Sequence, residues 1–119
     1  MGNPIPEAVN VTEADNGSQA TMKLEQELVV SLGSNPSTGY RWQVDDVDES
    51  VLQQVGMAQY TPNEPGSSPV PGQAGQETLR FQAAGAGQTW LVLVYRRSLY
   101  FVLWLKLTLH WRFLTKLEP

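Results

Sequence analysis

Apolar and polar residues alternate along most of the chain, and the apolar runs are short and bounded by Gly, Pro, Asn or Asp. A period of two places alternate side chains on one buried face of a β-strand, and turn residues end each strand. No stretch of comparable length has the helical period. The pattern predicts strands over residues 9–12, 20–24, 28–32, 40–44, 51–60, 77–83, 90–95 and 103–113. Seven or eight short strands joined by turns predict an all-β, antiparallel sandwich.

The same alternation predicts which side chains are buried. Leu79 and Phe81 fall on one face of their strand, and Leu109, Trp111 and Phe113 fall on one face of the last strand. The segment of residues 99–109 is very apolar, but Lys106 interrupts it. It is too short to cross a bilayer, so we interpret it as a buried strand and expect no membrane insertion.

Residues 61–75 differ from the rest because they are rich in Pro and Gly and contain little that can pack. The chain beyond residue 75 is too short to form an independent domain, so we interpret this stretch as a long surface loop within one domain. The 119 residues have the length of one domain with a single core. We therefore expect one domain over residues 1–119, with residues 1–8 a candidate for disorder.

The sequence Asn-Pro-Ser-Thr-Gly-Tyr at residues 35–40 predicts a stiff, polar connection between two core strands. Pro36 has a fixed φ and favours an extended conformation at Asn35. Gly39 permits a left-handed turn before the next strand. The side chains of Asn35, Ser37 and Thr38 can bond to the neighbouring backbone. These features also suit an ordinary strand connection.

Composition excludes several classes of function. The net charge of −4 argues against a nucleic-acid partner, because such proteins carry a basic excess. With no cysteine and His110 as the single histidine, disulfides, thiol nucleophiles and common zinc sites are excluded. The acidic residues 45–49 lack the spacing of a calcium loop, so we interpret them as a solvated turn and expect no metal and no cofactor. No signal peptide is visible, which is compatible with a cytoplasmic protein or a mature start.

Three segments in order along the chain resemble the motifs of the chagasin-like inhibitors of cysteine peptidases. The segment of residues 35–40, followed by Trp42, resembles the signature Asn-Pro-Thr-Thr-Gly-Tyr/Phe. The segment of residues 72–75 resembles a Gly-x-Gly-Gly loop. The segment of residues 97–99 stands where the family has Arg-Pro-Trp. The similarity covers roughly residues 9–97.

The resemblance implies an immunoglobulin-like sandwich with three loops at one end, which acts as a reversible inhibitor of papain-family cysteine peptidases and not as an enzyme. It implies that the first loop enters the peptidase cleft with Thr38 nearest the catalytic thiol, and that the other two loops contact the flanks. It further implies a monomer in the periplasm or outside the cell. The peptidase-binding residues that it implies are Asn35, Pro36, Ser37, Thr38, Gly39, Tyr40, Gly72, Gln73, Ala74, Gly75, Arg97, Ser98 and Leu99.

The sequence departs from the family pattern in two motifs. Ala74 replaces a glycine, which would cost about 1 kcal/mol if this position needs a positive φ. Ser98 and Leu99 replace the proline and the tryptophan of the third motif.

The alternative function is an immunoglobulin-like adhesion or carbohydrate-binding module with tryptophans as its contact surface. Trp42 and Trp111 share faces with aliphatic residues, which favours burial over such a role. Burial of Trp42, Trp90 and Trp111 would disfavour this alternative.

Overall fold

The computed structural model describes residues 7–63, 74–99 and 102–116. These residues form short and long strands and two 3-10 turns, with no α-helix among them. The strands are β1 (Val9–Val11), β2 (Gln19–Lys23), β3 (Glu27–Ser34), β4 (Arg41–Val47), β5 (Leu52–Gln54), β6 (Gln59–Pro62), β7 (Gly75–Ala83), β8 (Gly87–Leu99) and β9 (Val102–Lys116). The 3-10 turns are η1 (Glu13–Asp15) and η2 (Pro36–Thr38).

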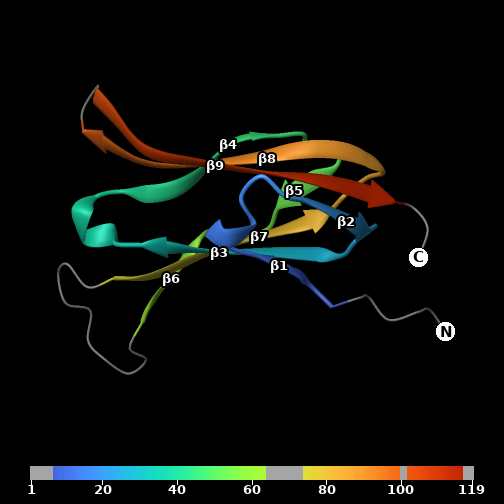
Figure 1. The fold of residues 1–119 in the computed structure, drawn as a ribbon, viewed down its shortest axis with the longest axis horizontal. Coiled ribbons are helices and arrows are strands. Elements are labelled where there is room, and N and C mark those ends of the chain that lie inside the picture. The colour runs from blue at the N-terminus through green and yellow to red at the C-terminus, as the bar shows by residue number, and fades with distance from the viewer. Residues whose placement is uncertain (1–6, 64–73, 100–101, 117–119) are drawn as a thin grey trace.

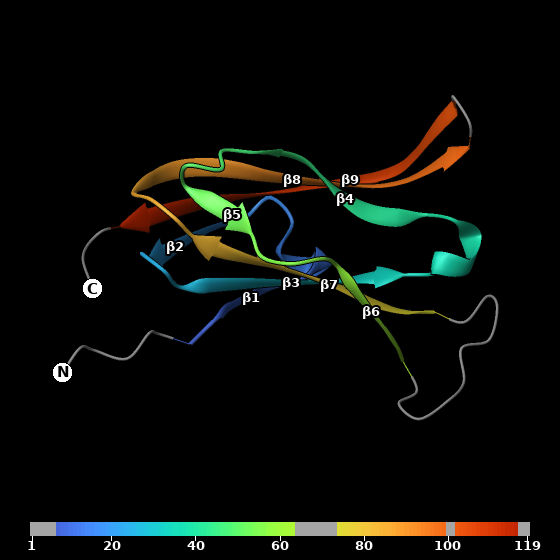
Figure 2. The same cartoon turned by 180° about the vertical axis from the view of Figure 1, so that it is seen from behind.

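Two sheets pack face to face, as Figure 1 shows, so the predicted all-β sandwich is confirmed. The five-stranded sheet has the order β1-β3-β7-β5, and β6 also pairs with β7. The four-stranded sheet has the order β2-β9-β8-β4. Figure 2 shows the same arrangement from behind, with β8 and β9 extending beyond the other strands of their sheet.

Most strand pairs of the sandwich are antiparallel, as expected, but both sheets are mixed, because each contains one parallel pair. β1 pairs with β3 in parallel, and β2 pairs with β9 in parallel. The chain passes from β1 in one sheet to β2 in the other and back to β3. β2 therefore provides the return path, and β3 runs in the same direction as β1. Alternation predicts where strands lie but does not reveal which sheet receives the next one.

The predicted strand over residues 51–60 is interrupted. β5 and β6 pair with different stretches of β7, and residues 55–58 separate them. Gly56 has φ of 71°, which lies far outside the extended range of a regular strand. Met57 is 87% exposed. The single long strand expected here is therefore two short strands joined by an exposed connection.

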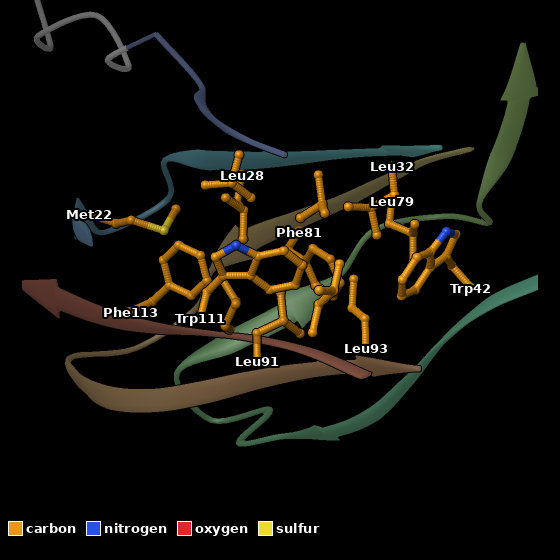
Figure 3. Close-up of a cluster of buried hydrophobic side chains, with 14 of the residues drawn as sticks. Met22, Leu28, Leu32, Trp42, Leu79, Phe81, Leu91, Leu93, Trp111 and Phe113 are labelled. Carbon is orange, nitrogen blue, oxygen red and sulfur yellow. The ribbon is translucent and has the colours of Figure 1, made fainter. Parts of the chain in front are cut away.

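The core lies between the sheets, and Figure 3 shows side chains of both sheets meeting there. Each large apolar side chain in it contributes about 1.5–3 kcal/mol by leaving water. The predicted inward positions Leu79, Phe81 and Trp111 are fully or almost fully buried. Trp90 differs: it begins the predicted strand of residues 90–95 but lies 46% exposed on the outer face of its sheet. Its ring packs edge-on against His110.

Candidate functional site

The loop of residues 35–40 (the 35–40 loop) joins the two sheets at one end of the sandwich. β3 of the five-stranded sheet ends at Ser34, and β4 of the four-stranded sheet begins at Arg41. The turn η2 lies between them. In Figure 1 it projects at the left, at the end opposite the labels N and C. The loop is therefore presented to solvent by two strands that belong to the packed core.

Hydrogen bonds among its own residues hold the 35–40 loop in shape. The Asn35 carbonyl accepts from the Thr38 N–H at 3.1 Å and from the Thr38 hydroxyl at 2.7 Å. The Ser37 hydroxyl donates to the Asn35 side-chain oxygen at 2.7 Å, and the Gly39 N–H donates to the Pro36 carbonyl at 2.9 Å. Ser37, Thr38 and Gly39 remain exposed. The predicted bonds of the small polar residues are thus present, and they leave the tip of the loop accessible.

Gly39 is required at its position for two separate reasons. Its φ is 85°, in the left-handed region that side chains rarely adopt, as its sequence context predicted. In addition, a Cβ placed on Gly39 would lie 2.9 Å from Cδ of Arg97. The aliphatic part of Arg97 therefore packs directly against the backbone of the loop.

A buried carboxylate lies beneath the loop. Glu77 of β7 has no exposed surface, and its Oε1 accepts from the Ser34 hydroxyl at 2.6 Å and from the Trp42 N–H at 3.3 Å. Arg41 Nε lies 3.3 Å from the same oxygen. Glu77 is not among the residues predicted from the sequence, although the alternation of β7 places it on the face of Leu79. A charged residue on an inward face was the signal that could have revealed it.

Aromatic side chains support the loop from the four-stranded sheet. The hydroxyl of Tyr95 in β8 accepts a hydrogen bond from the Asn35 N–H at 2.9 Å. The Tyr95 ring lies 5.3 Å from that of Tyr40 and 5.0 Å from that of Trp42, between ring centroids. The Trp42 indole N–H in turn donates to the Gly33 carbonyl at 2.9 Å. Tyr95 therefore contacts both ends of the loop, through a hydrogen bond at Asn35 and through ring packing at Tyr40.

The second predicted motif lies only partly within the described residues. Gly72 and Gln73 are outside them, Ala74 is exposed, and Gly75 is the buried first residue of β7. Among the described residues Glu25 alone has a positive φ without being glycine, so Ala74 carries none of the strain considered above. Gly75 itself lies in a strand, where the loop was expected to continue.

Gly75 is needed because the backbone is crowded there. It pairs with Ser34 on one side and with Pro62 on the other. A Cβ on Gly75 would collide with the carbonyl oxygen of Thr61, which is backbone and cannot move aside easily. A glycine at this point lets β6 and β7 approach each other beside the 35–40 loop.

The third motif forms a strand, which corrects the expectation of a loop. Arg97, Ser98 and Leu99 belong to β8 and pair with residues 102–104 of β9. The resemblance places proline at the position of Ser98, and proline cannot donate a hydrogen bond to a β-ladder. Serine retains its N–H, so the ladder continues to Leu99.

Arg97 points toward the 35–40 loop. Its Nη1 donates to the Thr38 carbonyl at 3.4 Å, and its guanidinium carbon lies 5.4 Å from the centroid of the Tyr40 ring. A guanidinium over an aromatic face at this distance is favourable. Arg97 is thus an internal support of the loop in the free protein.

The described residues of the three predicted segments lie at one end of the molecule. The turn η2, the end of the β8–β9 hairpin and the adjoining ends of β6 and β7 lie together in both views (Figures 1 and 2). A hollow of about 420 Å³ lies beside the loop, lined in part by Asn35, Ala74, Gly75, Tyr95 and Glu13. The end of the sandwich therefore presents one composite surface formed by segments far apart in the sequence.

No group of three or more potential metal ligands occurs in the described part of the chain. The carboxyl of Asp48, in the acidic turn, accepts bonds from the Ser50 hydroxyl at 2.6 Å and the Ser50 N–H at 3.0 Å. Both bonds lower the pKa of Asp48, and the bond from the Ser50 hydroxyl has the larger effect. Asp48 is exposed and belongs to the β4–β5 connection.

The family of this protein is established by its sequence together with this geometry. Residues 21–102 match the family described as Chagasin family peptidase inhibitor I42, so the chain belongs to the chagasin family of peptidase inhibitors. All three motifs lie within the matched residues, and the resemblance inferred from them is confirmed. The family consists of inhibitors, which agrees with the expectation that the chain is not an enzyme.

Solved structures of other proteins share the fold of this chain. The cysteine protease inhibitor EhICP2 from Entamoeba histolytica superposes with a TM-score of 0.78 at 18% identity, over 96% of this chain and 100% of that chain. Amebosin superposes with a TM-score of 0.71 at 24% identity, over 93% and 99% of the two chains. PbICP-C, solved in complex with falcipain-2, gives 0.51 at 12% identity, over 99% and 96%. These likenesses establish the fold.

A search among proteins with curated descriptions finds no match. Within the described residues, no helix has the length and apolar character that a membrane-spanning helix needs.

Proposed function

We propose that this protein inhibits papain-like cysteine peptidases reversibly, by inserting the 35–40 loop into the active-site cleft. Its family is one of peptidase inhibitors, and EhICP2, which shares its fold, is a cysteine protease inhibitor. Thr38 is exposed at the tip and would lie nearest the catalytic thiol. Asn35, Pro36, Ser37, Gly39 and Tyr40 would form the rest of the inserted wedge.

The observation that carries this proposal is the order of the loop before it meets a partner. Its tip is exposed, yet each of its two ends is bonded to the core, through Tyr95 at Asn35 and through Glu77 at Trp42. A binding loop that is already ordered loses less conformational entropy when it docks. A loop with fixed geometry also need not present its peptide bonds in the orientation that attack by the thiol requires.

The flanks of the cleft would be contacted by the other two segments. Gly72, Gln73, Ala74 and Gly75 would lie on one side of the inserted loop. Arg97, Ser98 and Leu99 would lie on the other side, as part of the β8–β9 hairpin and not as a free loop. A complex of this kind is expected to bury about 1,600 Å² in total. The protein would act as a monomer, and the family supports a periplasmic or secreted location.

The adhesion or carbohydrate-binding alternative is disfavoured by the tryptophans. Trp42 and Trp111 are buried, with 4% and 0% exposure. Trp90 is exposed, but the guanidinium of Arg112 lies over its ring at 5.6 Å from the centroid. Of the three tryptophans whose side chains the structure describes, two are buried and the third has a guanidinium over its ring, which disfavours a platform for sugar stacking.

Titration of papain tests the proposal. The wild-type protein is expected to lower the hydrolysis of a fluorogenic peptide in a concentration-dependent way, and activity should return on dilution. Thr38→Arg should raise the inhibition constant on the order of 100-fold, because it places a bulky charge at the centre of the contact. Thr38→Ser keeps the hydroxyl that bonds to Asn35 and should stay close to wild type.

Two results would contradict the proposal. In the first, micromolar wild-type protein leaves papain and a cathepsin fully active, although circular dichroism shows the native fold. In the second, Thr38→Arg inhibits as well as the wild type, which would show that the 35–40 loop does not contact the peptidase.

A further inference from the structure

Glu77 is a carboxylate in a place where a carboxylate is costly. It has no exposed surface and lies in the same inward row of β7 as Leu79 and Phe81. Removing an ionised group from water costs several kcal/mol unless hydrogen bonds and an opposite charge compensate for it. The contacts of Glu77 therefore indicate what it does for the molecule.

One oxygen of Glu77 contacts both strands that carry the 35–40 loop. Oε1 accepts from Ser34, the last residue of β3, and from the N–H of Trp42, the second residue of β4. β3 belongs to the five-stranded sheet and β4 to the four-stranded sheet. The two bonds limit the distance between these strands where the loop leaves them. Arg41, half-exposed at the surface, adds a charge at 3.3 Å from the same oxygen.

We infer that Glu77 is a positioning residue for the inhibitory loop, a role that rests on the proposed function and deepens it. It never touches the peptidase, since it is fully buried. By holding Ser34 and Trp42 to one atom it sets the width of the loop at its base. Trp42, whose backbone N–H it holds, also donates its indole N–H to the Gly33 carbonyl and packs against the Tyr95 ring.

The second oxygen of Glu77 provides a specific way to test this role. Within the described residues Oε2 has no hydrogen-bond partner. Glu77→Gln can therefore place its carbonyl oxygen where Oε1 is and its amide where Oε2 is, so that both acceptor bonds survive. Glu77→Met has nearly the same shape but no acceptor, and it releases Ser34 and Trp42 together.

The experiment compares these variants by inhibition of papain and by backbone order. Glu77→Met should raise the inhibition constant about thirtyfold, because the loop must then be ordered on binding. The NMR order parameters of the Ser37, Thr38 and Gly39 amides should fall from about 0.85 to below about 0.6. Glu77→Gln should stay within about threefold of wild type and keep the loop rigid. Ser34→Ala, which removes the 2.6 Å bond alone, should lie between them.

Leu79→Ala is the matched control. It removes a buried apolar side chain two residues along the same face of β7, which offers no hydrogen-bonding group to the loop, and should cost about 2–5 kcal/mol of stability. At a temperature where it is fully folded, its inhibition constant and loop order parameters should match wild type. Equal weakening by Leu79→Ala, or unchanged loop order in Glu77→Met, would overturn the inference. If Glu77→Met does not fold, Ser34→Ala decides in its place by the same two measurements.

The two proposals fail in different ways. If wild-type protein does not inhibit papain, the proposed function is lost, but the order parameters still show whether Glu77 holds the loop. If wild-type protein inhibits and Glu77→Met inhibits equally well, the function stands and the positioning role is overturned.

Discussion

Two exposed connections in this protein each contain a glycine with a positive φ, yet their surroundings differ. Gly39 in the 35–40 loop has φ of 85°, and Gly56 in the connection of residues 55–58 has φ of 71°. A Cβ on Gly39 would meet the side chain of Arg97, whereas a Cβ on Gly56 would meet no described atom within 4 Å. The same local backbone geometry therefore occurs once in a packed environment and once in open space.

The difference shows where the rigidity of the 35–40 loop originates. Residues 55–58 are joined to the neighbouring strand by the bond from the Val55 N–H to the Arg80 carbonyl, and Met57 points into solvent. In the 35–40 loop, the Asn35 N–H donates to the Tyr95 hydroxyl, the Thr38 carbonyl accepts from Arg97, and a buried carboxylate lies at the base. A left-handed glycine makes a turn possible, but tertiary contacts from other strands give the turn one shape.

The largest difference between the two connections is expected for substitution of their glycines by alanine. Both Gly39→Ala and Gly56→Ala introduce strain of about 1–2 kcal/mol, because a Cβ is disfavoured at positive φ. Gly39→Ala also displaces Arg97, so the inhibition constant for papain should rise on the order of tenfold or more. Gly56→Ala should lower the melting temperature while leaving inhibition unchanged. If the two variants weakened inhibition equally, the packing around Gly39 would not be the reason why the 35–40 loop inhibits.

Loss of a single supporting bond should have a smaller effect. Tyr95→Phe keeps the ring between Tyr40 and Trp42 but removes the oxygen that accepts from the Asn35 N–H. Since one such bond contributes about 0.5–1.5 kcal/mol, the inhibition constant should rise roughly fivefold. Met57→Ala, in the other connection, is the control and should inhibit like the wild type. If Tyr95→Phe inhibits like the wild type, the bond from the Asn35 N–H to the Tyr95 hydroxyl is not needed to order the loop.

The smallest effect is expected at Arg97. Arg97→Met retains an unbranched stem beside Gly39 but loses the guanidinium at the Thr38 carbonyl and over Tyr40. Arg97 is half-buried and its hydrogen bond to the Thr38 carbonyl is long at 3.4 Å, so the inhibition constant should rise only about threefold, and less at high salt. Arg80→Met, which breaks the surface ion pair with Glu27, should have no effect on inhibition. A rise beyond about thirtyfold would show that Arg97 acts mainly through its proposed contact with the flank of the peptidase cleft, and only secondarily as a support of the 35–40 loop.

Much of the architecture could be predicted from periodicity because burial of one strand face is a local property. Leu79, Phe81, Trp111 and Phe113 alternate with polar residues, and all four are buried. Trp90 follows no such rule, since a strand residue on the outer face of a sheet can be apolar when a neighbour packs against it. Arg112 and His110 provide that packing, from the adjacent strand β9.

The site was predictable to the extent that its chemistry is local. Pro36, Gly39 and the short polar side chains between them were sufficient to predict a tight, exposed turn. Glu77 was missed because its partners lie on two other strands, more than thirty residues away in the chain. No local pattern shows that a carboxylate on an inward face will meet a serine hydroxyl and a backbone N–H.

The sequence by itself therefore determined where strands and turns form, because steric restriction at proline, freedom at glycine and the alternation of apolar residues act over a few neighbours. The tertiary structure alone decided that two strand pairs run parallel, that Arg97 lies in a hairpin and that Glu77 joins both ends of the 35–40 loop. These features depend on hydrogen bonds and packing between segments distant along the chain, and the partners meet only when the two sheets close on one core.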